Sequence, residues 1–143
     1  YATVEYLPNI GYMMDDNAEL ESMFRLLIEL QTRGALVFVV NIYPGTQRYT
    51  DSAIICGKFN KSVPTIGCNT RERVLEIGER IAQMAHETRA HVIRVDADRS
   101  PELFGADSFH INQTGHDHVF AQMARINATH TPSSCVSSKK KIN

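Results

Sequence analysis

The sequence predicts one α/β domain in which parallel strands are covered by helices. Apolar segments typical of strands alternate with segments of 3.6-residue period, in the order β-α-β-α-β-α. At 143 residues the chain is long enough to bury a real core. A hydrophobic share of 43% and a net charge of −1 fit a globular protein and give no overall field that would attract nucleic acid or acidic membranes. We expect the domain to cover residues 1–128, followed by a disordered polar tail at 129–143.

The first half of the domain contains two predicted strands around one helix. Residues 3–7 alternate and are rich in strand-forming types, so they predict a strand. A helix is expected at 19–31 and ends at Gly34. Residues 35–42 form a nearly unbroken apolar run, which is typical of a strand buried on both faces of a parallel sheet. The helix has its apolar positions at helical spacing: Leu20, Met23, Phe24, Leu27, Ile28 and Leu30.

The second half repeats the pattern after a long connection at 43–69. A helix is predicted from Thr70 to about Thr88, and a short strand at 91–95. A loop then leads to a last helix, for which Thr114 is a suitable N-terminal cap. Alternation of this kind implies parallel strands with helices on both faces of the sheet. The loops that follow the strands therefore share one edge, where ligands of such sheets bind.

The last of these loops carries the residues with the clearest chemistry. Asp107 and His110 are three residues apart, so their side chains can meet within one turn. A neutral imidazole can take a proton from a hydroxyl, and a carboxylate that fixes its tautomer improves it as a base. Asn112 and Gly115 follow at the start of the last helix. The pattern favours Asp107 and His110 as catalytic residues of a hydrolase.

The segment Asp-Ser-Phe-His-Ile-Asn-Gln-Thr-Gly-His at 107–116 resembles the last sequence block of the SGNH (GDSL-type) hydrolases. This resemblance implies a three-layer sandwich of flavodoxin-like SGNH-hydrolase architecture over roughly residues 3–126. It also implies a Ser-His-Asp triad in which His110 is the general base and Asp107 the orienting acid. Acylated sugars, lipids or small esters are the substrates it implies, and it implies no cofactor.

The chain departs from the family at the nucleophile, because no Gly-Asp-Ser block follows a strand. We therefore expect the architecture to be incomplete in this chain, with the serine on a missing N-terminal segment or a partner chain. Asn9, at a strand end, is the candidate oxyanion donor. Tyr43 and Arg48 are candidates for contact with substrate from a rim loop.

Two other functions fit the same residues. One is a catalytically inactive, hydrolase-like binding domain. The other is a metal-dependent hydrolase with His110, His116 and Asp107 as ligands, although His116 and His118 would not face each other on a helix. We expect neither a metal nor a cofactor, no nucleic-acid partner, and no membrane span, since no apolar run approaches about 20 residues. Cys56 and Cys68 are close enough in sequence for a short disulfide, and the sequence leaves the compartment open with a slight preference for secretion.

Overall fold

A computed structural model describes residues 1–6, 16–47 and 71–130 of the chain. The described elements are β1 (Ala2–Tyr6), α1 (Asp16–Thr32), β2 (Val37–Tyr43), α3 (Arg71–Glu87), β3 (His91–Asp96), the short 3-10 helix η2 (Pro101–Leu103) and α4 (Gln113–Thr129). Their order is the predicted β-α-β-α-β-α, and the α/β fold class is confirmed. Asn9, Arg48, Cys56, Cys68 and the tail beyond residue 130 lie outside the described residues.

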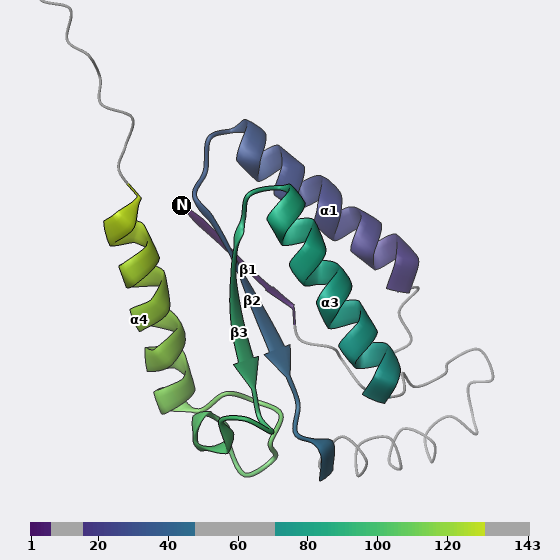
Figure 1. Ribbon diagram of the computed structural model, residues 1–143, viewed down its shortest axis with the longest axis vertical. Coiled ribbons are helices and arrows are strands. Elements are labelled where there is room, and N and C mark those ends of the chain that lie inside the picture. The colour runs from purple at the N-terminus through teal and green to yellow at the C-terminus, as the bar shows by residue number, and fades with distance from the viewer. Residues whose placement is uncertain (7–15, 48–70, 131–143) are drawn as a thin grey trace, which may run out of the picture.

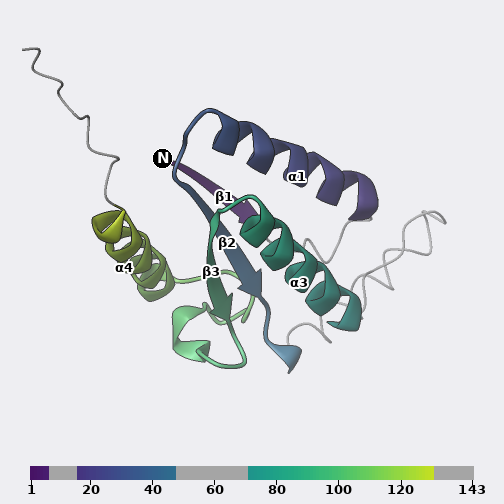
Figure 2. The same ribbon diagram turned by 45° about the horizontal axis from the view of Figure 1, so that its top comes forward.

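The strands form a parallel sheet in the order β1-β2-β3. Figure 1 shows α1 and α3 on one side of the sheet and α4 on the other, and the turned view in Figure 2 agrees. Both helices that connect consecutive strands lie on the same side, as expected when each connection runs in the same direction and has the same hand. All seven residues of β2 are buried, which confirms the prediction of a strand covered on both faces.

Two apolar clusters fill the spaces between the layers. Alternate residues of β2 point to opposite faces, so Val37 and Val39 pack toward α1 and α3, whereas Phe38 and Val40 pack toward α4. The α4 side also receives Val119 from the helix. The buried cluster on the α1 and α3 side is Leu20, Met23, Leu27, Val37, Val39, Ile77, Ile81 and Ala85.

One helix buries a narrower stripe than the sequence predicts. In α1, Leu20, Met23 and Leu27 are buried, whereas Ile28 is exposed and Phe24 is only partly buried. The three buried residues follow a spacing of three and four, which is the width of face that an outer helix presents to a single packing surface. Among the described residues, no helix is both long enough and apolar enough to cross a bilayer.

Candidate active site

The Asp–His pair (Asp107 and His110) is formed as the sequence predicts. Asp107 Oδ2 lies 2.5 Å from His110 Nδ1. The other carboxylate oxygen, Oδ1, accepts the backbone N–H groups of Phe109 and His110, both at 3.0 Å. One carboxylate therefore organises the turn through Oδ1 and holds the imidazole through Oδ2.

Electrostatics keep the Asp107 carboxyl ionised at neutral pH. The hydrogen bond from the His110 ring, aided by the two backbone N–H groups, lowers the pKa of Asp107 to about 2, against a smaller opposing effect of desolvation. An ionised carboxylate can only accept hydrogen bonds. His110 must therefore carry its proton on Nδ1 when the ring is neutral, which leaves the lone pair on Nε2.

The His110 ring is accessible as well as oriented. Its side chain is 71% exposed, compared with 39% for that of Asp107. The ring of Phe109 packs against it edge to face, with the two ring centroids 5.4 Å apart. Within residues 1–6, 16–47 and 71–130, Asp107 is the one hydrogen-bonding partner of the ring, and no serine, threonine or cysteine bonds to it.

A closed loop carries the pair at the carboxyl end of β3. Gly105 N–H donates to the His110 carbonyl at 2.8 Å, and Ser108 N–H donates to the Gly105 carbonyl at 2.9 Å. Phe104 and Ile111 form an isolated antiparallel bridge at the base of the loop. Ser108, between the two catalytic candidates, has a φ of 51° in the left-handed region, which costs a non-glycine residue of order 1–3 kcal/mol.

Asn112 joins this loop to α4. Its Oδ1 accepts the N–H of Gly115 at 3.0 Å, so Asn112 is the helix cap, whereas the sequence suggests Thr114. Its Nδ2 donates to the carbonyls of Glu102 and Phe104, both at 2.8 Å. All of these contacts are structural, and they fix where α4 leaves the loop that carries the Asp–His pair.

The glycine at position 115 is also explained by the structure. A Cβ atom at this position would lie 2.3 Å from the Leu103 carbonyl oxygen and 2.8 Å from Ile111 Cβ. The first turn of α4 therefore lies directly on the loop after β3, and only glycine fits there. Of the residues that resemble the family motif, Asn112 and Gly115 thus hold the backbone in place, whereas Asp107 and His110 form the hydrogen-bonded pair.

The loop after β2 also forms hydrogen bonds to the loop that carries the Asp–His pair. The sequence does not indicate this contact. Gly45 N–H donates to the Ser108 carbonyl at 3.1 Å. Thr46 donates to Asp98 through both its N–H, at 2.8 Å, and its hydroxyl, at 2.5 Å. Asp98 in turn donates its N–H to Asp96 Oδ1 at 3.0 Å. The carboxyl-terminal loops of two adjacent strands are thereby joined.

Tyr43 is not the rim residue that the sequence suggests. It is the last residue of β2 and is 2% exposed, because its ring fills the space beside Gly78, where a Cβ would approach the hydroxyl to 2.5 Å. Its hydroxyl accepts a hydrogen bond from Asn41 at 3.0 Å, and the Arg94 guanidinium lies 4.0 Å from the ring centroid. Burial raises the pKa of Tyr43. The residue supports the core at the end of the strand.

A metal centre has no support in the described part of the chain. There, no group of three or more His, Cys, Asp or Glu side chains is placed to hold an ion. His116 is exposed at the start of α4, and His118 pairs with Gln122 at 2.7 Å along the helix.

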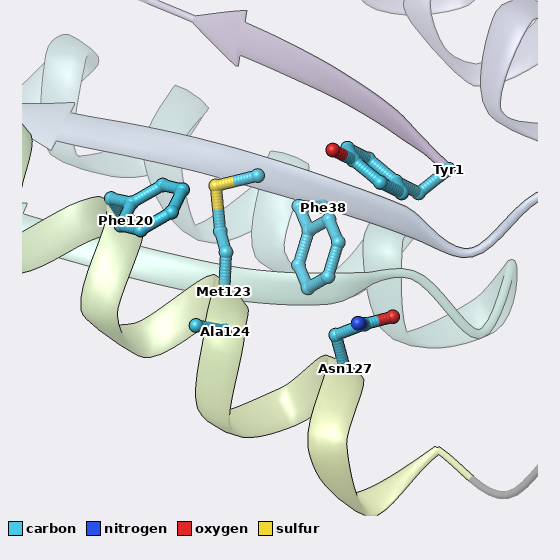
Figure 3. Close-up of a pocket in the computed structure, with 6 residues that line it drawn as sticks. All are labelled: Tyr1, Phe38, Phe120, Met123, Ala124 and Asn127. Atoms are coloured by element: carbon cyan, nitrogen blue, oxygen red, sulfur yellow. The ribbon is translucent and has the colours of Figure 1, made fainter.

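An apolar groove of about 150 Å³ lies at the opposite end of the sheet (Figure 3). Tyr1 precedes β1 and Phe38 is the second residue of β2, whereas the Asp–His pair follows the carboxyl end of β3. The groove is therefore not an acyl pocket beside His110. Tyr1 is 87% exposed and Phe120 is 71% exposed. The residues that line the groove are Tyr1, Phe38, Phe120, Met123, Ala124 and Asn127.

Comparison with known proteins adds no family assignment. No protein-family model matches the chain, and no curated protein is similar to it in sequence.

Proposed function

We propose that this chain supplies the general base and the orienting acid of a serine-dependent ester hydrolase of SGNH type. The observation that supports the proposal is the contact of 2.5 Å between Asp107 Oδ2 and His110 Nδ1, in a loop at the carboxyl end of a parallel sheet. It is the arrangement in which a carboxylate fixes the tautomer of an imidazole and stabilises the imidazolium. The substrates proposed are esters of sugars, lipids or small alcohols.

The proton transfers follow from the tautomer. His110 Nε2 takes the proton of a serine hydroxyl as the serine oxygen bonds to the acyl carbon and the carbonyl electron pair moves to its oxygen. When this intermediate collapses, the bond to the leaving alcohol breaks, and the alcohol oxygen takes the proton from Nε2. Water then repeats the two steps on the acyl-serine. Asp107 remains ionised throughout and holds the ring.

The serine is proposed to come from a companion segment or chain that extends the sheet beyond β1. In the described residues β1 pairs with β2 alone, so its other edge is open in this part of the chain, and the exposed rings of Tyr1 and Phe120 line an apolar groove together with Phe38 of β2. An open edge next to exposed apolar rings favours an added strand. A strand that paired in parallel with β1 would end at the same edge of the sheet as the Asp–His pair.

The base is tested by His110→Ala in the complete protein, with a short-chain aryl acetate as substrate. We expect kcat to fall by at least about 10³-fold, because no other group would accept the serine proton. His116→Ala is the matched control, since His116 is exposed nearby and is assigned no role. Wild-type turnover by His110→Ala would end the proposal, and an equal loss in both variants would favour the metal-dependent alternative.

The nucleophile is tested separately with a fluorophosphonate, which modifies activated serines. We expect the label on a serine of the companion, and we expect it to disappear in His110→Ala. A label on a serine of this chain would support the proposed hydrolase activity but contradict the proposal that a companion supplies the serine. A second candidate function, an inactive binding domain, rests on the absence of a nucleophile bonded to His110 in the described residues, and it predicts no labelling at all.

A further inference from the structure

We propose that Gly45 is a positioning residue for the Asp–His pair and acts through the carbonyl group of Ser108. The inference rests on the proposed function for its catalytic consequence, but not for its structural content. Gly45 follows β2 and is far in sequence from the pair, and it contacts no reacting atom. It donates its N–H to the Ser108 carbonyl at 3.1 Å.

Ser108 is the residue at which the turn would otherwise relax. Its φ of 51° is a conformation that non-glycine residues adopt only when the surroundings hold them there. Ser108 lies in the chain between Asp107 and the residues Phe109 and His110, whose N–H groups both donate to Asp107 Oδ1. A shift of Ser108 to negative φ would turn those N–H groups away and separate the carboxylate from the ring. The bond from Gly45 opposes that shift.

The space around Gly45 is narrow on the side that faces Ser108. A Cβ at Gly45 would lie 3.3 Å from Ser108 Cβ, and 3.5 Å from both Ala97 Cβ and Asp98 Oδ1. Contact at 3.3 Å is tighter than most real Cβ atoms accept, so Ser108 or Gly45 would have to shift by a few tenths of an ångström. Thr46, the next residue, is bound to Asp98 through two hydrogen bonds. The loop after β2 is therefore anchored, and the displacement would fall on Ser108.

The test uses Gly45→Ala, the double variant Gly45→Ala with Ser108→Gly, and Gly34→Ala as control. Removing the Ser108 side chain removes the atom that the new methyl group at position 45 would meet, so the double variant should restore the pair. Gly34 lies before the start of β2, at the end of the strand far from the site, with a φ of 74° and no atom within 4 Å of where a Cβ would lie. Its replacement strains the backbone without contacting the site, which controls for a general loss of stability.

The readouts are nuclear magnetic resonance signals of the pair in the full chain. We expect Gly45→Ala to weaken the His110 Nδ1–H signal and to move the carboxyl titration of Asp107 from about 2 toward its ordinary value of about 3.9. The double variant should return both signals, and Gly34→Ala should leave both at wild-type values. Unchanged signals in Gly45→Ala, or no recovery in the double variant, would overturn the inference.

A measurement on the wild-type chain decides the matter if Gly45→Ala does not fold. The Gly45 amide hydrogen should exchange slowly and open together with the His110 amide; unprotected exchange at Gly45 beside a protected His110 would contradict the proposal. In the complete hydrolase, Gly45→Ala should lower kcat by up to about 100-fold with little change in KM. If fluorophosphonate labels no serine, the proposed function fails, whereas the resonance signals still decide whether Gly45 positions the pair.

Discussion

At the carboxyl end of the sheet polar side chains hold the loops together by hydrogen bonds, whereas at the amino end the aromatic side chains of Tyr1 and Phe120 are exposed to solvent. Asp107 and Asp98 each accept hydrogen bonds through both carboxylate oxygens. Asn112 accepts through its amide oxygen and donates through its amide nitrogen. Tyr1 and Phe120 are mostly exposed around the groove. The difference shows that the described residues hold the Asp–His pair in place, whereas the surface around Tyr1 and Phe120 remains exposed.

The largest expected effect sharpens the chemical side of this comparison. Asp107→Asn keeps an oxygen for the N–H groups of Phe109 and His110 but places an amide NH₂ donor against His110 Nδ1. The ring would then adopt the tautomer with its proton on Nε2 and lose its function as a base. We expect a loss of about 10⁴-fold in kcat in the complete protein with the fold retained. The same rate as wild type would show that Asp107 only shapes the turn.

Gly115→Ala tests whether the packing at the carboxyl end is as close as the structure shows. At an unconstrained helical position this change normally stabilises by up to about 1 kcal/mol. Here the new Cβ would lie 2.3 Å from the Leu103 carbonyl oxygen, so we expect the opposite sign, a loss of about 1–3 kcal/mol in the free energy of unfolding. Urea denaturation measures it, and a gain in stability would show that α4 moves freely relative to the loop.

The sequence predicts the order and class of the elements because periodicity is a local property. Apart from η2, where the sequence predicts only a loop, each described strand and helix is within about three residues of its expected range, and Asp107 and His110 meet because they are only one turn apart. Contacts between distant segments leave no such trace. Thr46 and Asp98 are 52 positions apart, and nothing in a Pro-Gly-Thr sequence indicates which carbonyl Gly45 will bind.

Other differences arise where two residues have similar propensities. Asn112 and Thr114 are both good caps, and the choice is made by the two carbonyls that Asn112 also binds. The left-handed φ of Ser108 has no sequence signature, since a serine normally avoids it. The amphipathic ring of Tyr43 is typical of a rim loop, so the sequence suggests an exposed position. In the structure the ring is buried beside Gly78, which belongs to α3 and is distant in sequence.

The pH dependence of stability is a smaller effect at the same end. The folded-state pKa of Asp107 is about 2, below its ordinary value, so the contribution of this carboxylate is present above about pH 4 and is lost as the pH falls from about 4 to 2. The side chain is partly exposed, and solvent weakens the effect. The difference in unfolding free energy between wild type and Asp107→Asn should shrink from pH 5 to pH 3; a difference that grew would contradict the assigned shift.

The smallest expected effect concerns the amino end. Phe120→Ala should change the free energy of unfolding of this chain by less than about 0.5 kcal/mol, because the ring is largely exposed. Val119→Ala is the matched comparison one residue away, where the buried side chain contributes on the order of 1–2 kcal/mol. If Phe120→Ala were as costly as Val119→Ala, the groove would already be a filled part of the core, and the comparison of the two ends would fail.

The hydrogen bonds of Asn112 also bear on covalent modification. Asn112-Gln-Thr114 has the form of an N-glycosylation site, yet its amide nitrogen already donates to the carbonyls of Glu102 and Phe104. A sugar on that nitrogen would replace one of its two hydrogens and break the bond to one of these carbonyls. In the folded chain both hydrogens of this amide are in use, so a glycan could be attached there only to a chain that had not yet formed the loop after β3.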